Sequence, residues 1–168
     1  MKQSEIEKIQ FGLDSFGDIP VDEEGNLFTH AEAIRQVVKE AILADKLGID
    51  VIALGEHHRP DFSISSPETV LAGIATQTKN IKLASGVTVL SSDDPVRVFE
   101  RFATLDALSN GRAQVILGRG SFTESFPLFG YEMSDYELLF EEKIELFSKL
   151  LKEKPVTWSG KTRASLED

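Results

Sequence analysis

Short apolar runs alternate along this chain with longer stretches of helical periodicity, and this alternation restricts the fold more than any other feature. The run from Asp50 to Gly55 is apolar at successive positions, as expected for a strand that is covered on both faces. Similar units recur at a spacing of about 30 to 35 residues. The pattern predicts a parallel sheet built from four βα units, with strands at Ile9 to about Phe16, Asp50 to Gly55, Ile81 to Leu90 and Ala113 to Leu117.

Two pairs of residues have the spacing of a capping box, in which a hydroxyl and a carboxylate bond to the free amides of a first helical turn. Thr29 and Glu32 predict the start of the first helix, and Ser134 and Glu137 predict the start of the last. Charged residues 141–143 in the last helix are expected to form a solvated face.

The geometry of the sheet is left open by periodicity alone. Right-handed crossovers allow the sheet to curl into an arc, and four units form half of a (β/α)8 TIM-type barrel. An open doubly wound sheet is the rival arrangement. The chain has 168 residues, whereas a complete eight-unit barrel has about 250. We therefore expect residues 1–168 to form a single α/β domain that is the N-terminal part of a longer barrel.

Composition excludes several classes of function. The chain has no cysteine, which rules out disulfides, thiolate metal sites and cysteine nucleophiles. A net charge of −10 argues against nucleic acid as a partner. No apolar run approaches the roughly 18 residues of a membrane span, and the first residues lack the apolar region of a secretion signal. We expect a cytoplasmic protein that binds neither membrane nor nucleic acid.

Polar clusters follow three of the predicted strands. They occupy residues 56–59, 91–94 and 118–121. Because the carboxyl ends of parallel strands meet at one edge of a barrel or doubly wound sheet, these clusters are predicted to lie together and to contain the functional site.

The motif Glu56-His57-His58 has three interpretations. A metal site is one, although neighbouring strand residues point to opposite faces and cannot readily hold one ion. In the second, one histidine and Glu56 are structural hydrogen-bonding groups. In the third, His57 faces a cavity as a proton donor or acceptor near neutral pH.

The Gly118-Arg119-Gly120-Ser121 stretch allows a ligand to approach the backbone closely, and a guanidinium suits a phosphate. It is not a dinucleotide-binding fingerprint, because Thr123 stands where the third glycine would be. The residues alone are compatible with two interpretations of this segment, an anion-binding loop and an ordinary tight loop.

Taken in order, segments 48–58, 91–112 and 115–122 resemble the luciferase-like monooxygenase family over nearly the whole chain. The resemblance implies a (β/α)8 barrel that binds reduced FMN, supplied by a partner reductase, or a deazaflavin in some branches. It implies monooxygenation of a small organic substrate with dioxygen. It also implies a catalytic His57 with His58 beside it at the cofactor, and Arg119 as a phosphate ligand with Gly120 and Ser121 in its loop.

The same resemblance places a cofactor-supporting, non-prolyl cis peptide at Gly86-Val87. Two departures from the family pattern stand out. Luciferases proper carry a second phosphate-binding arginine near the position of Glu137, and family members continue well beyond Asp168 through four more βα units.

These departures keep other hypotheses in view. An incomplete half-barrel exposes strand edges, so the chain is expected to pair with a second copy or with the absent C-terminal half. It could equally be a flavin-binding or oligomerising remnant, or a fragment of a longer protein. A metal hydrolase on a similar barrel is a third hypothesis, and it rests only on the histidine pair.

Overall fold

Four parallel strands form the main sheet of the computed structural model, which describes residues 9–152 and 154–167. Their order in space is the same as their order in the chain: β1 (Gly12–Ser15), β2 (Val51–Leu54), β3 (Lys82–Ser85) and β5 (Ala113–Gln114). A doubly wound sheet would reverse direction at a switch point, and this sheet does not. The chain therefore forms part of a barrel of the TIM type.

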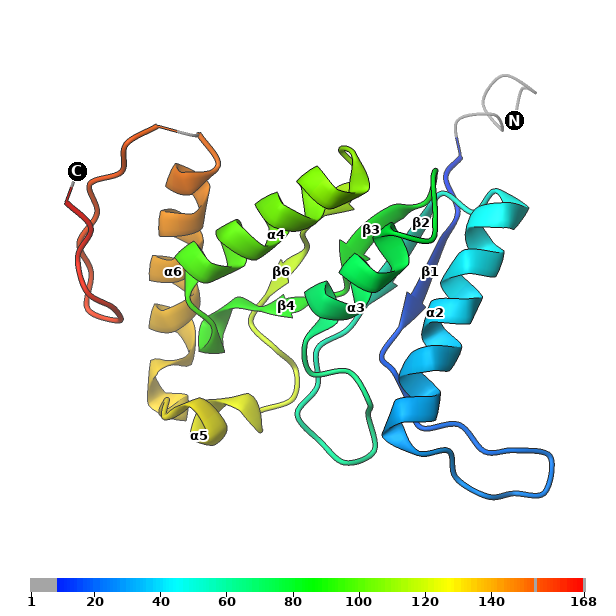
Figure 1. The fold of residues 1–168 in the computed structure, drawn as a ribbon. Helices are drawn as coiled ribbons and strands as arrows, with labels where there is room; N and C mark the ends of the chain where they lie inside the picture. The colour runs from blue at the N-terminus through cyan, green and yellow to red at the C-terminus, as the bar shows by residue number, and fades with distance from the viewer. Residues whose placement is uncertain (1–8, 153, 168) are drawn as a thin grey trace.

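The helices pack on one another in the same sequence as the strands (Figure 1). Helix α2 contacts α3, α3 contacts α4, and α4 contacts α6, so that they follow the arc of the sheet. Their bounds are α2 His30–Leu47, α3 Pro67–Ala75, α4 Pro95–Ser109 and α6 Tyr136–Leu150, with shorter helices η1 Leu90–Ser92, α5 Ser125–Phe129 and η2 Met133–Asp135.

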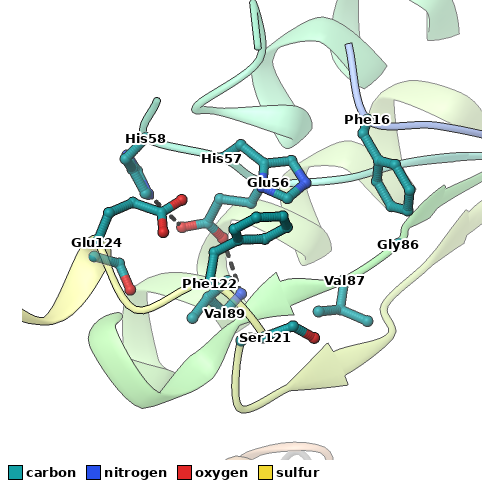
Figure 2. A pocket seen from close by; sticks show the side chains of 12 residues that line it. Phe16, Glu56, His57, His58, Gly86, Val87, Val89, Ser121, Phe122 and Glu124 are labelled. Carbon is teal, nitrogen blue, oxygen red and sulfur yellow. Dashed lines mark hydrogen bonds and ion pairs between the residues drawn. The ribbon is translucent and has the colours of Figure 1, made fainter. Parts of the chain in front are cut away.

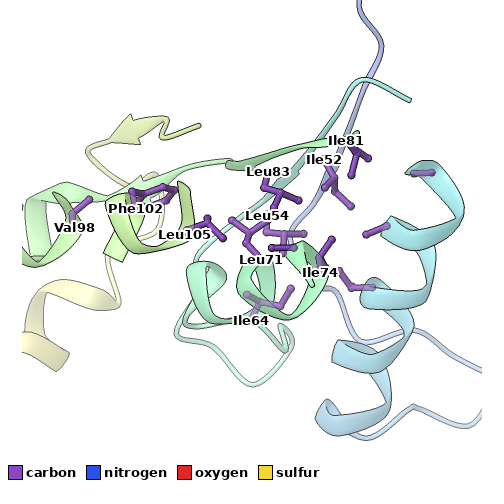
Figure 3. Close-up of a cluster of buried hydrophobic side chains, with 14 of the residues drawn as sticks. Ile52, Leu54, Ile64, Leu71, Ile74, Ile81, Leu83, Val98, Phe102 and Leu105 are labelled. Atoms are coloured by element: carbon purple, nitrogen blue, oxygen red, sulfur yellow. The ribbon is translucent and has the colours of Figure 1, made fainter. Parts of the chain in front are cut away.

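Apolar side chains of the sheet and of helices α2, α3 and α4 form the core. Leu54 and Leu83 of the strands are buried against Leu71 and Ile74 of α3, and Leu105 of α4 continues this cluster (Figure 3). Each such side chain contributes about 1.5–3 kcal/mol on burial. The core thus fixes the strands while their carboxyl ends remain available for loops.

The predicted third and fourth strands are each broken in two, which corrects the continuous runs expected from the apolar pattern. The third continues beyond β3 as β4 (Thr88–Val89), and the fourth continues beyond β5 as β6 (Leu117–Gly118). β4 and β6 pair with each other in parallel, as a separate two-stranded sheet. Gly86 and Val87 at the first break are partly buried, whereas Gln114 and Ile116 at the second are exposed.

The first predicted capping box is confirmed and the second is wrong. The Thr29 hydroxyl accepts the Glu32 amide, and the Thr29 amide donates to the Glu32 carboxylate over 2.9 Å. Ser134 instead lies within η2, whose turn delays the first residue of α6 to Tyr136. Glu137 is therefore one position too early to complete a capping box, and its carboxylate is available for another partner.

Candidate functional site

A cavity of about 250 Å³ lies at the carboxyl ends of the strands (Figure 2). Its lining comes from the segments that follow β1, β2, β3 and β6: Phe16, Glu56, His57, His58, Gly86, Val87, Val89, Gly120, Ser121, Phe122, Glu124 and Ser125. Residues 56–58 and 120–121, predicted to meet at this edge, do so. Asp93, from the third predicted cluster, lies next to this cavity rather than in its lining.

His57 lies among three phenylalanine rings. It stacks on Phe62 with ring centroids 4.1 Å apart, and it contacts Phe16 and Phe122 edge to face at 5.4 and 5.0 Å. Burial lowers the pKa of His57, which favours the neutral imidazole. Its Nδ1 atom is buried and has no hydrogen-bond partner in the described structure. The imidazole is thus held by ring packing, with one ring nitrogen buried and unpaired.

His58 is held by hydrogen bonding instead. Its Nε2 lies 3.0 Å from Glu56 Oε1, and the other Glu56 oxygen accepts the Val89 amide over 2.9 Å. The side chains of His58 and Glu56 are only 11% and 9% exposed. The structure thus contains both arrangements considered for this motif, a hydrogen-bonded Glu56–His58 pair and a His57 that faces the cavity.

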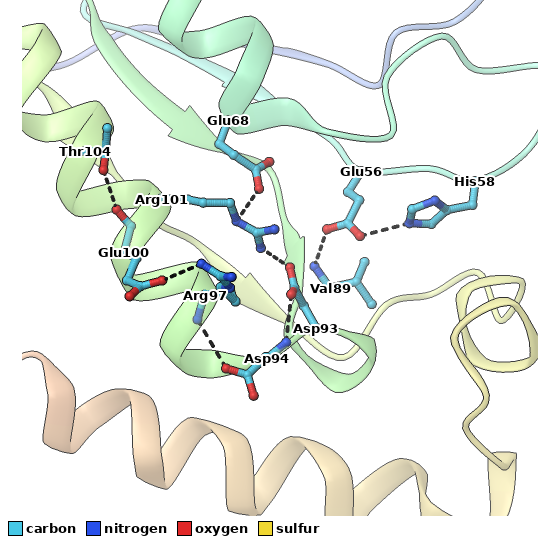
Figure 4. A network of polar contacts seen from close by, with 10 residues as sticks. All are labelled: Glu56, His58, Glu68, Val89, Asp93, Asp94, Arg97, Glu100, Arg101 and Thr104. Carbon is cyan, nitrogen blue, oxygen red and sulfur yellow. Dashed lines mark hydrogen bonds and ion pairs between the residues drawn. The ribbon is translucent and has the colours of Figure 1, made fainter. Parts of the chain in front are cut away.

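A second group of polar side chains lies beside this pair (Figure 4). A second cavity of about 330 Å³ shares Glu56 and His58 with the first and is also lined by Glu68, Asp93 and Arg101. Arg101 forms ion pairs with Glu68 and Asp93. The distance from its Nε to Glu68 Oε1 is 2.6 Å. Burial raises the pKa of Glu68, while Arg101 acts in the opposite direction. Arg101 therefore offsets the charge that these carboxylates bring to the strand ends.

The loop after β6 packs tightly against β4. Gly120 has a φ of +83°, and a Cβ atom there would lie 2.8 Å from a methyl group of Val89, so only glycine fits without strain. The Gly120 carbonyl accepts the Tyr136 hydroxyl over 3.0 Å, which ties this loop to the first turn of α6. Gly120 and Ser121 both line the cavity.

The Arg119 side chain leaves this loop on the other side. It is not among the residues that line the cavity. Its Nη2 lies 3.2 Å from Glu137 Oε2, and its guanidinium carbon lies 5.0 Å from the centre of the Phe140 ring. The predicted phosphate ligand therefore lies beside the first turn of α6, adjacent to the cavity wall.

Gly86 and Val87 form the cavity wall opposite the histidines. The peptide bond between them is cis, as the family resemblance predicts. A Cβ atom at Gly86 would lie 2.8 Å from Asp14 Oδ1 and 3.0 Å from the Ala53 side chain. Glycine at this position lets β3 come close to its neighbours, and Val87 presents an apolar side chain to the cavity.

Two parts of this region differ from what the sequence suggested. Phe62, the ring stacked on His57, lies in an irregular loop where no periodic pattern could identify it. Lys143 was expected on a solvated helix face but is 1% exposed. Its ammonium donates to the Ser91 carbonyl over 2.6 Å, and burial lowers its pKa to about 8. Helix α6 turns this residue inward because it packs on both η1 and α4.

Comparison with known proteins agrees with this arrangement of strands and loops. The family model described as luciferase-like monooxygenase matches residues 15–167. The chain belongs to the luciferase-like monooxygenase family. Limonene 1,2-monooxygenase of Rhodococcus erythropolis is 34% identical over 126 residues, which cover 74% of this chain and 33% of that protein.

Solved structures superpose well on the chain. The oxygenating constituent of 3,6-diketocamphane monooxygenase from Pseudomonas putida, in complex with FMN, has a TM-score of 0.80 and 25% identity, and the match covers 95% of this chain and 44% of that one. An F420-dependent secondary alcohol dehydrogenase, in complex with an F420-acetone adduct, has a TM-score of 0.73 at 22% identity, over 94% of this chain and 46% of that one, and shows a shared fold.

The chain spans less than half of the length of the relatives described above. Over residues 9–152 and 154–167, none of the helices is both long and apolar enough to cross a membrane.

Proposed function

We propose that this chain is part of a flavin-dependent monooxygenase that uses reduced FMN and dioxygen on a small organic substrate. The observation that carries the proposal is His57, packed among aromatic rings, facing a cavity at the carboxyl ends of the strands. Membership of a monooxygenase family supports the class of reaction.

The residues present fit a flavin. A flat, largely apolar ring system needs an apolar wall, and Val87 with the nearby aromatic side chains supplies one. The buried Nδ1 of His57 lacks a partner, and a polar edge of the ring could provide it. The exposed backbone of Gly120 and Ser121 allows the cofactor to approach closely.

Each residue then has a defined task. Bound reduced flavin would supply the electrons that activate dioxygen. His57 would hold or release a proton at Nδ1, and its neutral state at pH 7 allows it to accept one. Phe16, Phe62 and Phe122 would orient its ring and exclude water. Arg119 would pair with the phosphate, and His58 would hold the adjacent loop through Glu56.

The remainder of the barrel is needed for a complete pocket. We propose that it comes from the C-terminal half or from a second copy of this chain, and that a partner reductase supplies the reduced cofactor. A deazaflavin is the alternative cofactor, because the F420-dependent neighbour shares the fold.

Ligand titration followed by fluorescence tests the cofactor, with analytical ultracentrifugation of the same sample to report its mass. FMN, in oxidised and reduced form, is expected to bind more tightly than a deazaflavin. Saturable binding at a dimeric mass would support completion by a second copy. Preferential deazaflavin binding would replace FMN as the cofactor, and no binding of either ligand would contradict a flavin site in this chain.

Arg119→Ala tests the phosphate contact. Loss of a charge-assisted contact is expected to weaken FMN binding about tenfold or more, and to weaken riboflavin, which lacks the phosphate, less than about twofold. Equal losses for both ligands would remove Arg119 from this role.

A further inference from the structure

We propose that Glu137 is a specificity-determining residue that competes with a ligand's phosphate for Arg119, so that a phosphorylated flavin has to displace a carboxylate from the guanidinium. The inference rests on the proposed flavin site. It goes beyond that site by assigning a role to an acidic residue in the first turn of α6.

The position of Arg119 is set by two residues of α6. Glu137 Oε2 lies 3.2 Å from Nη2, and the Phe140 ring lies 5.0 Å from the guanidinium carbon. Residues three apart on a helix share one face, so the two contacts act on the guanidinium from the same side of α6. The Tyr136 hydroxyl bonds the Gly120 carbonyl and keeps this turn next to the cavity wall.

The ion pair is accessible to a ligand. The side chains of Arg119 and Glu137 are 46% and 64% exposed. A guanidinium binds carboxylate and phosphate through the same parallel N–H groups, so both anions cannot use one edge of it together. A phosphate monoester carries a charge of about −1.5 to −2 at pH 7, and a carboxylate left nearby would repel it.

The expected size of the effect is modest because both groups reach solvent. Exposed ion pairs contribute little, and repulsion across a few ångströms near a surface adds a similar amount. We expect Glu137→Gln to raise the affinity for FMN about threefold to tenfold and to change that for riboflavin less than about twofold. The gain should shrink in about 1 M salt, which screens exposed charges.

Glu141→Gln is the matched control. Glu141 is exposed one helical turn beyond Glu137, so its replacement removes the same charge from α6 while the Arg119 pair stays intact. The affinity ratio of FMN to riboflavin should stay at the wild-type value in this variant. If Glu141→Gln raises the ratio as much as Glu137→Gln does, the effect comes from the general charge of the helix, and the inference is wrong.

The experiment measures dissociation constants for FMN and riboflavin with the wild type and both single variants. An unchanged ratio in Glu137→Gln, with flavin still bound, would overturn the inference and leave the proposed function intact. Absence of flavin binding in every variant would overturn the proposed function and the inference together.

A second measurement separates competition from simple repulsion. In an Arg119→Gln background, Glu137→Gln should raise FMN affinity by clearly less than it does in the wild type, because repulsion is still relieved but there is no guanidinium to release. A gain as large as in the wild type would overturn the competition. Titration with inorganic phosphate, followed by the NMR signal of Arg119 Nε, should show a lower midpoint in Glu137→Gln than in the wild type, and equal midpoints would count against the inference.

Discussion

His57 and His58 are adjacent in the segment after β2, but their surroundings differ sharply. His57 lies among aromatic rings with a buried nitrogen that has no partner in the described structure, whereas His58 is hydrogen-bonded to Glu56 and lines a second cavity together with Arg101. The first environment tolerates an unpaired polar atom next to a cavity, and the second satisfies its polar atoms within the protein. One histidine is therefore held by ring packing and the other by hydrogen bonding.

The alternation of side chains along an extended chain explains the difference. Residues two apart project to the same side, which brings Glu56 and His58 together, and the residue between them projects away. Substitutions at three positions test this division, because a hydrogen-bonded pair and an aromatic cluster respond differently to the loss of one polar group.

The largest effect is expected from Glu56→Ala. The substitution leaves the Val89 amide and the His58 ring without their acceptor in a region that is about one-tenth exposed. We expect the free energy of unfolding to fall by about 2–4 kcal/mol, measured by urea denaturation. Glu56→Gln, which keeps an acceptor for the Val89 amide, should cost less than about 1.5 kcal/mol. Equal costs for the two variants would show that packing, rather than hydrogen bonding, matters at this position.

His58→Phe should have an intermediate effect. The new ring can keep the edge contact with Phe129, whose centroid lies 5.0 Å from that of His58, but Glu56 Oε1 loses its partner. We expect a loss of about 1–2 kcal/mol in the same denaturation experiment. A neutral result would place His58 outside the supporting network and remove the contrast between the two histidines.

His57→Phe should have the smallest effect at pH 7. Phenylalanine fits an aromatic cluster and removes a buried nitrogen that lacks a partner, so stability should change by less than about 1 kcal/mol. Destabilisation as large as that of His58→Phe would show that the two histidines contribute equally to stability. Binding of FMN should nevertheless weaken if His57 contacts the cofactor.

The pH dependence of this variant sharpens the test. Because the folded-state pKa of His57 lies below its ordinary value of 6.5, the unfolded state binds more protons between the two values. Wild-type stability should therefore fall as the pH drops below about 6.5. His57→Phe should lack this part of the decline, and the difference in stability between the two proteins is the quantity to measure.

Much of the fold could be predicted because the relevant signals are local. The spacing of apolar residues predicted the βα units, and the Thr29–Glu32 pair predicted the start of α2. The resemblance over residues 48–58, 91–112 and 115–122 predicted the family, which the family model confirms. The grouping of polar residues at strand ends follows from parallel pairing, which is the same for every βα unit.

The sequence by itself determined which side chains are available at the strand ends, since strand direction and alternation are properties of the local backbone. Only the tertiary structure decided that Phe62 stacks on His57, that Lys143 turns inward to Ser91, and that Glu137 pairs with Arg119 rather than capping α6. These contacts join different loops and helices, and their geometry depends on how whole elements pack. Periodicity carries no information about that packing, because it describes each element separately.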